Sequence, residues 1–327
     1  MLMKPIVTGR PGIAPKLHSG TKQGAGTQSV WKKMRENYML YLFLLPALLY
    51  VLFFSYAPLY GIQIAFKDFS AYKGIWDSPW VGLKHFSTFF SSYRFWLLLK
   101  NTLVLSLYSL LAGFPIPIIL ALMLNYVKNH RFKKYTQTLT YAPHFISTVV
   151  LVGMLSMFLS PSSGFVNTLL NKLGMDSVYF FGEASLFKHV YVWSGVWQSS
   201  GWGAIIYIAA LAGVSPELHE AAVIDGATKF DRVKHIDLPA LMPTAIILLI
   251  MNAGSVMSVG FEKAFLMQTD LNLNASEIIA TYVYKVGMQN AEYSYSTAIG
   301  LFNNVINLII LVLVNQLAKR FSETSLW

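Results

Sequence analysis

Residues 220–239 read EAAVIDGATKFDRVKHIDLP, a polar stretch enclosed by two almost purely apolar ones. The segment before it, residues 203–214, reads GAIIYIAALAGV, and the segment after it, residues 240–251, reads ALMPTAIILLIM. Apolar helices of this kind suit a hydrocarbon environment, whereas the charged side chains between them would be costly there. The polar stretch is therefore predicted to connect two membrane-spanning helices.

The composition of the whole chain supports a membrane protein. The chain has 327 residues, of which 55% are hydrophobic and 12% charged, whereas soluble domains usually carry about 25% charged residues. It has no cysteine, which excludes disulfides, thiolate metal sites and thiol nucleophiles. The net charge of +10 comes from basic residues beside hydrophobic segments rather than among aromatics on a polar face. That distribution is typical of membrane topology and argues against nucleic-acid binding.

Six segments are apolar enough for a membrane span, since a hydrocarbon core about 30 Å thick needs a helix of roughly 20 apolar residues. The fourth is the least apolar, because its first half contains YVWSGVWQSSGWG. The sequence therefore predicts an all-α membrane protein with six transmembrane helices. The predicted spans lie at about residues 38–64, 102–126, 138–160, 190–214, 240–260 and 297–317.

The distribution of basic residues predicts the orientation. Six spans place both termini on one side of the membrane, and the positive-inside rule selects that side. With the termini in the cytoplasm, the cytoplasmic segments hold 16 of the 25 lysines and arginines. We therefore expect cytoplasmic tails at residues 1–37 and 319–327 and a transmembrane domain at residues 38–318, whose polar loop 214–239 faces the cytoplasm. The first tail, rich in Gly, Lys, Thr and Pro, is predicted to be disordered.

The polar loop carries the signals of two short helices joined by a bend. Ser215 is a good N-cap, and Pro216 suits the first helical position, where a missing N–H costs nothing. Gly226 stands where a C-terminal cap needs a positive φ angle. Thr228 and Asp231 are spaced as a capping pair for the second helix. The loop is therefore predicted to be an L-shaped amphipathic hairpin.

Two interpretations of this hairpin remain open from the residues alone. Its apolar face could pack against its own helix bundle, which would make it a simple connector. Alternatively, it could dock another protein, because small alanine side chains permit close backbone approach and Glu220 offers a carboxylate to an arginine of a partner.

The hairpin resembles the EAA loop of binding-protein-dependent ABC importer permeases, including the nine residues between its glycine and its isoleucine. The matching positions are Glu220, Ala221, Ala222, Asp225, Gly226, Ala227, Ile236, Leu238 and Pro239. Asp237 departs from the family, in which threonine is commoner.

A wider likeness covers residues 38–327. The chain is similar to the carbohydrate-uptake branch of this family, and within it to the polysaccharide and lipoprotein-transport type, to which alginate-importer permeases belong. The likeness is carried by YAPHFIS at 141–147, WQSSGWGAIIYIAALAGV at 197–214, GFEKAFL at 260–266, TYVYKVG at 281–287 and the final SLW.

The resemblance implies a type I ABC importer permease fold in the bacterial cytoplasmic (inner) membrane. It implies that the chain works with a second homologous permease, two ABC ATPase subunits and an extracytoplasmic solute-binding protein. The implied substrate is an oligosaccharide, with acidic alginate- or pectin-like chains among the candidates. In such permeases the EAA loop couples to the ATPase, whose closure switches the permease between inward-open and outward-open states. The implied coupling residues are Glu220, Ala221, Ala222, Asp225, Gly226 and Ala227, with Glu220 as the main polar contact.

The chain itself lacks the motifs of an enzyme. A phosphate-binding loop needs GxxxxGK followed by Ser or Thr, and no Gly-Lys pair occurs in the sequence. Neither HExxH nor GxSxG is present. We therefore expect no catalytic residue, metal or cofactor in this chain, and we expect the partner subunits to bind ATP and magnesium and to hydrolyse the ATP.

Polar side chains within the spans predict the substrate path, because such groups usually face an aqueous cavity and aromatic faces stack on sugar rings. The candidates are Trp193, Trp197, Gln198, Trp202, Asn252, Ser255, Asn303 and Asn304. The alternative is that the serines and asparagines only hold helices together. Four basic residues near the predicted outer mouth could steer an acidic sugar, or they could be ordinary juxtamembrane charges: Lys67, Lys84, Arg94 and Lys263.

A self-contained ion-coupled sugar carrier is the main alternative function. Such carriers need carboxylates within the membrane, and the predicted spans other than the fourth contain none. A membrane-embedded enzyme is a second alternative, against which the missing nucleophile and metal spacings argue.

Overall fold

The computed structural model describes residues 37–321 and residue 325. Within these residues every regular element is a helix, and strand pairing is limited to two isolated bridges, Lys67–Trp80 and Ser70–Gly74. The predicted all-α fold is therefore confirmed for the described part of the chain. Most of the two predicted tails lies outside the described residues. The chain divides into two compact units, residues 1–60 and 61–327.

The first unit contributes the beginning of a long apolar helix. Helix α2 (Tyr38–Val51) continues through a π-helical turn (Leu52–Tyr56) into a 3₁₀ segment (Ala57–Phe66) that reaches into the second unit. The whole run Tyr38–Phe66 has 29 residues and a mean hydropathy of 2.0. It is long enough to cross a bilayer, as expected for the first predicted span.

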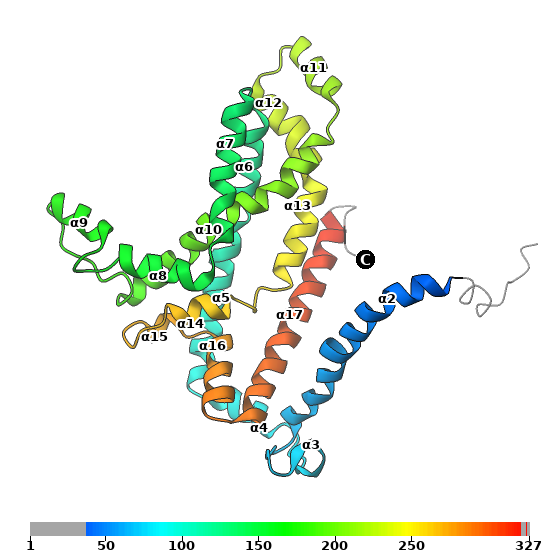
Figure 1. Cartoon of the computed structure of the whole chain (residues 1–327), viewed down its shortest axis with the longest axis vertical. Coiled ribbons are helices and arrows are strands. Elements are labelled where there is room, and N and C mark those ends of the chain that lie inside the picture. The colour runs from blue at the N-terminus through cyan, green and yellow to red at the C-terminus, as the bar shows by residue number, and fades with distance from the viewer. Residues whose placement is uncertain (1–36, 322–324, 326–327) are drawn as a thin grey trace, which may run out of the picture. The chain divides into compact units, whose positions relative to one another are not determined.

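The second unit holds the remaining α-helices (Figure 1). They are α3 (Gly74–Asp77), α4 (Lys84–Ser91), α5 (Arg94–Gly113), α6 (Pro115–Asn125), α7 (His130–Tyr141), α8 (Thr148–Phe158), α9 (Phe165–Lys172), α10 (Ala184–Ala212), α11 (Pro216–Ile224), α12 (Lys229–Arg232), α13 (Leu238–Ala253), α14 (Phe261–Leu266), α15 (Leu273–Ser276), α16 (Ile279–Tyr284) and α17 (Tyr293–Phe321).

Every predicted span falls on a helix or a bent pair of helices. Besides the first run, three continuous stretches of the described chain are long and apolar enough to cross a membrane: Arg94–Asn125, Lys229–Ala253 and Tyr293–Arg320. Two bent pairs meet the same criterion only when each is taken together: His130–Phe145 with Thr148–Phe158, and Ala184–Ala212 with Pro216–Ile224. The described residues thus provide four continuous spans, or up to six if each bent pair is one span.

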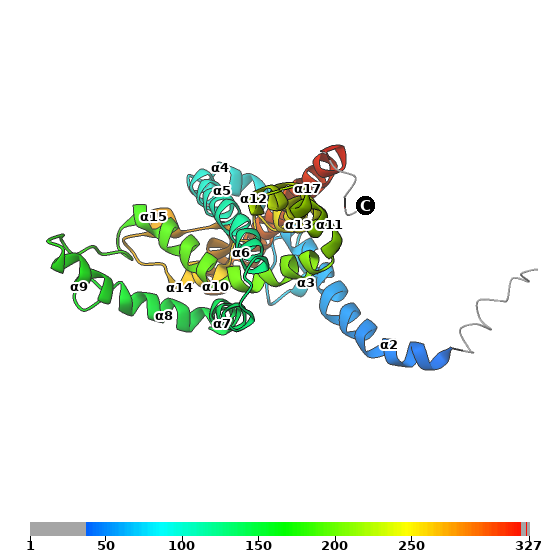
Figure 2. The same ribbon diagram turned by 90° about the horizontal axis from the view of Figure 1, so that it is seen from above.

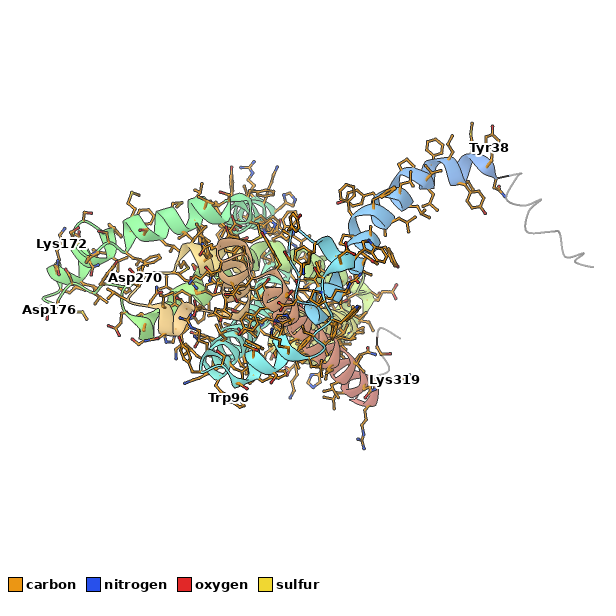
Figure 3. The ribbon with its side chains drawn as sticks, turned by 90° about the horizontal axis from the view of Figure 1, so that it is seen from below. Tyr38, Trp96, Lys172, Asp176, Asp270 and Lys319 are labelled. Atoms are coloured by element: carbon orange, nitrogen blue, oxygen red, sulfur yellow. The ribbon has the colours of Figure 1, made fainter. Side chains whose placement is uncertain are left out.

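The third predicted span, 138–160, is not one helix, which corrects the sequence-based expectation. The chain turns by 100° between His130–Phe145 and Thr148–Phe158. Pro143 lacks the N–H that would continue the α-helical hydrogen bonds of α7. The Ser147 side chain then accepts a hydrogen bond from the Val150 N–H and begins α8 as its N-cap. As a result, α8 and α9 form an arm that extends away from α13 (Figures 1 and 2), with Lys172 and Asp176 at its far end (Figure 3).

Helix α10 is the centre of the second unit and packs against α5, α6, α7, α13 and α15. Helices in lipid associate through close packing of small residues rather than through the hydrophobic effect. Ala121, Ala204 and Ala245 are accordingly buried where α6, α10 and α13 meet. At Gly201 an added Cβ would lie 2.0 Å from the Thr140 carbonyl oxygen, so the backbones of α7 and α10 are in direct contact.

A buried carboxylate ties the region before α16 to α5. Glu277 accepts from the Arg94 guanidinium at 2.9 Å and from the Lys285 ammonium at 3.0 Å. Its side chain is only 6% exposed, and a buried carboxylate is tolerated when it is paired in this way.

Candidate functional site

Two features of the second unit are candidates for function: the hairpin at residues 214–239 and a polar cavity beside α10. The hairpin is built from α11, α12 and a π-helical turn (Val233–Asp237), and α11 is bent by 73° from α10. Ser215 begins α11 by accepting a hydrogen bond from the Glu217 N–H at 3.3 Å. The predicted N-cap is therefore present.

The bend between the two short helices has the predicted chemistry. Gly226 adopts φ +80°, and nothing lies within 4 Å of the position where a Cβ would be, so the backbone conformation rather than space selects glycine. Thr228 and Asp231 form a reciprocal capping box at the start of α12. Local capping interactions therefore fix the shape of the hairpin.

Most side chains of the hairpin are exposed on the surface of the chain. No residue of α11 or α12 is buried, and the apolar side chains of Ile224 and Phe230 are 85% and 74% exposed. Glu220, Ala221, Asp225 and Gly226 are exposed, and Ala222 and Ala227 are half-buried. This exposure argues against a connector whose apolar face packs on its own bundle.

A buried acid anchors the base of the hairpin. Asp237 is fully buried and accepts a hydrogen bond from the Tyr126 hydroxyl at 2.6 Å. The His219 Nε2 atom of α11 lies 3.4 Å from its other carboxylate oxygen. The Arg232 guanidinium lies 5.3 Å from the centre of the Tyr126 ring. The contacts of Asp237 thus connect α11, the end of α6 and the start of α13.

Sequence reasoning did not identify Tyr126 or His219, because their roles depend on contacts between distant segments. One signal was available: Asp237 directly precedes an apolar segment, and a carboxylate at the edge of a membrane helix needs a partner.

The second candidate is a cavity of about 500 Å³ bounded by α5, α6, α10 and α13. This volume lies within the usual range of small-molecule sites. An adjoining cavity of about 310 Å³ shares several lining residues, among them Ser109 and Asn252. Serine hydroxyls and amides in the first cavity could exchange hydrogen bonds with a polar ligand; these residues are Ser109, Gln198, Ser199, Ser200 and Asn252.

The structure separates the predicted path residues into three groups. Gln198 and Asn252 line the larger cavity, and Ser255 lines the adjoining one. Asn303 and Asn304 line a different cavity, of about 410 Å³, beside α14 and α16. The substrate role of all five remains a prediction.

The three predicted tryptophans line none of these cavities. Trp193, Trp197 and Trp202 are exposed by about half. Trp193 donates from Nε1 to the Tyr108 hydroxyl at 2.8 Å, and Trp202 stacks on the His144 ring at 4.6 Å. In this single chain they therefore lie outside the cavity that Gln198 and Asn252 line.

Lys263 lines the cavity of about 500 Å³, and its role in steering sugar at the outer mouth remains a prediction. Its ammonium donates to the Tyr191 carbonyl oxygen at 2.8 Å and lies 4.8 Å from the centre of the Tyr191 ring. Burial lowers the pKa of Lys263 to about 8, because a low-dielectric site disfavours the charged form.

The other basic residues of the predicted outer mouth have local partners. Lys84 pairs with Asp68 at 3.4 Å, and Lys67 donates to the Ile75 carbonyl oxygen at 2.6 Å. Arg94 is held by Glu277, as described above.

Known proteins with similar sequences include a transport system permease. Residues 113–323 match the family described as "Binding-protein-dependent transport system inner membrane component". The chain is 42% identical to Protein LplB of Bacillus subtilis (strain 168), over 96% of this chain and 99% of that protein. It is also 42% identical to the polygalacturonan/rhamnogalacturonan transport system permease protein YteP of the same organism, over 90% of this chain and 92% of that protein.

A solved structure has the same fold. It is a bacterial alginate ABC transporter in complex with an alginate pentasaccharide-bound periplasmic protein, and the TM-score is 0.85. The matched chain is 39% identical, over 91% of this chain and 100% of that one. The family that the hairpin sequence indicated is thus confirmed. The chain belongs to the inner membrane components of binding-protein-dependent transport systems, which are the permease subunits of ABC importers.

Proposed function

We propose that this chain is the permease subunit of an importer of acidic oligosaccharides. The cavity beside α10 supports this proposal, because it combines hydroxyl and amide groups with one ammonium group. YteP is named for polygalacturonan and rhamnogalacturonan transport, and the similar solved structure for alginate. A second homologous permease would complete the translocation path, and an extracytoplasmic solute-binding protein would deliver the sugar.

The importer is proposed to contain two ABC ATPase subunits, and the hairpin is proposed to contact one of them. The exposure of the hairpin is the observation that carries this part of the proposal. Glu220, Ala221, Asp225 and Gly226 present a carboxylate and a small-residue surface to a partner. ATP and Mg²⁺ would be bound by those partner subunits. Closure of the ATPase dimer would pull on α11, and the contacts of Asp237 would transmit this movement to α6 and α13.

The distribution of basic residues supports a location in the bacterial cytoplasmic membrane with both termini and the hairpin in the cytoplasm. In this orientation the hairpin faces the compartment that supplies ATP.

Uptake by the complete importer in proteoliposomes tests the proposal. We expect sugar uptake that requires ATP, both permeases and the binding protein. Uptake by this chain alone, driven by an ion gradient without ATP, would instead identify an ion-coupled carrier.

Two isosteric variants of α11 test the coupling role. Glu220→Gln removes the proposed contact, so we expect sugar-stimulated ATP hydrolysis to fall about tenfold, the cost of losing one charge-assisted hydrogen bond. Glu217→Gln removes another exposed carboxylate, in the first turn of the same helix, and should change the rate less than twofold. Equal rates in both variants would contradict the role of Glu220.

A further inference from the structure

We propose that the Lys263 ammonium binds a carboxylate of the transported sugar, so that this subunit itself selects for uronate units. The inference rests on the proposed import of acidic oligosaccharides and assigns the recognition of the acid group to one residue. The position of Lys263 in the wall of the cavity carries this inference.

The residues around Lys263 position its ammonium group in the wall of the cavity. The side chain is 9% exposed, its ammonium donates to the Tyr191 carbonyl oxygen, and the Tyr191 ring stabilises the cation from one side. A Cβ added at Gly195 would lie 3.2 Å from the Lys263 Nζ atom. The glycine therefore leaves the room that the ammonium occupies.

The ammonium has donors left for a ligand. A lysine ammonium carries three N–H groups, and the carbonyl of Tyr191 takes one of them. Among the described residues, no carboxylate forms an ion pair with Lys263; the four ion pairs there join other residues. Lys263 is also the only charged residue among the described residues that line the larger cavity.

A purely structural role does not require a charge at this position. A neutral amide could donate to the Tyr191 carbonyl and hold α14 against α10 equally well. A buried charge without a paired counter-charge is costly, and Lys263 is buried without one among the described residues. The missing counter-charge is what the carboxylate of a uronate would supply, while Ser109, Gln198 and Asn252 offer partners for ring hydroxyls.

Equilibrium binding to the complete membrane complex in nanodiscs tests this inference. The complex contains both permeases and both ATPases. The probes are trigalacturonate and the same trisaccharide with its three carboxyl groups reduced to neutral alcohols. For Lys263→Gln we expect trigalacturonate to bind at least tenfold more weakly, the size of one lost charge-assisted contact, and the neutral probe to change less than twofold.

Two further variants make the test specific. Lys263→Arg keeps the charge and should retain most of the preference for trigalacturonate. Lys188→Gln removes an exposed lysine near the beginning of α10 and should leave the preference unchanged. Gel filtration of each assembled complex shows whether a variant has lost its partners.

The possible results distinguish a failure of the inference about Lys263 from a failure of the proposed importer function. If Lys263→Gln binds trigalacturonate as tightly as the wild type, or weakens both probes equally, the inference is wrong while the importer function stands. If the wild-type complex binds neither probe and takes up no acidic sugar, the proposed substrate class fails and the inference falls with it.

Discussion

At the scale of the residue, the backbone conformation of Gly226 determines the shape of the hairpin that is proposed to contact the ATPase. A left-handed φ of +80° is open to glycine, tolerable for asparagine and unfavourable for alanine. Because no atom lies near the missing Cβ, a substitution acts through the backbone alone.

We therefore expect Gly226→Ala to destabilise the hairpin by about 1 kcal/mol and Gly226→Asn to cost less. The rate of tryptic cleavage after Lys229 and Lys234 measures opening of the hairpin, and it should rise in the order wild type, Asn, Ala. Faster cleavage of the Asn variant than of the Ala variant would show that side-chain contacts, not φ, control this bend.

Lys263 predicts a pH dependence of sugar binding. Its pKa of about 8 lies below that of an exposed lysine, so the charged form is lost as the pH rises through 8. Titratable side chains near it include Tyr191, which donates to the Gly260 carbonyl, and Tyr207, which lines the same cavity. Glu262 on the same helix is exposed, and Tyr284 packs on Phe261 of that helix. The carboxylates of a uronate are already ionised at neutral pH.

Affinity for trigalacturonate should accordingly fall about tenfold between pH 7 and pH 9, because the protonated fraction of a group with pKa 8 falls from about 0.9 to about 0.1. Affinity for the carboxyl-reduced trisaccharide should stay constant. Lys263→Arg should abolish the pH dependence, since an arginine stays charged throughout this range. An unchanged pH profile in the arginine variant would place the titrating group elsewhere.

At the scale of the element, the Asp237 cluster connects the hairpin to the bundle. Tyr126→Phe would leave a buried carboxylate oxygen without its donor, which usually costs about 1–3 kcal/mol. We expect the double variant Tyr126→Phe/Asp237→Asn to be more stable than Tyr126→Phe, because no buried charge is then left with a lost partner. Thermal unfolding of the purified complex compares the two variants, and a double variant that is no more stable than Tyr126→Phe would contradict this interaction.

The elements show which parts of the structure the sequence could predict. The caps at Ser215, Thr228 and Gly226 were predicted correctly, because each depends on residues within one turn. The bend near Pro143 was missed, although the proline gave a signal, because hydropathy alone continues through it.

The site was predicted less completely than the fold, because it depends on which helix face meets which neighbour. Gly195 and Ser199 face the cavity, and Trp193 and Trp197 precede them by two residues, about 200° around the helix. Sequence position near Gln198 was therefore a poor guide to the tryptophans. Lys263 lies on the six-residue helix α14, whose packing against α10 is set by contacts with residues about 70 positions away.

At the scale of the whole molecule, the arm and the hairpin should meet opposite sides of the membrane. The positive-inside rule places the hairpin in the cytoplasm, and α10, as the single span between α9 and α11, would place the tip of the arm outside. These two positions determine which partner each surface can reach.

The absence of cysteine allows this topology to be measured with single introduced thiols. A membrane-impermeant maleimide should label Lys172→Cys, at the far end of the arm (Figure 3), in spheroplasts. Lys229→Cys on α12 and Lys319→Cys near the end of α17 should react only in inside-out vesicles. Added ATPase subunits should then slow labelling at Lys229→Cys and not at Lys319→Cys, because only the hairpin is proposed to contact them. Labelling of Lys229→Cys from the outside would reverse the orientation, and the hairpin could then not reach a cytoplasmic ATPase.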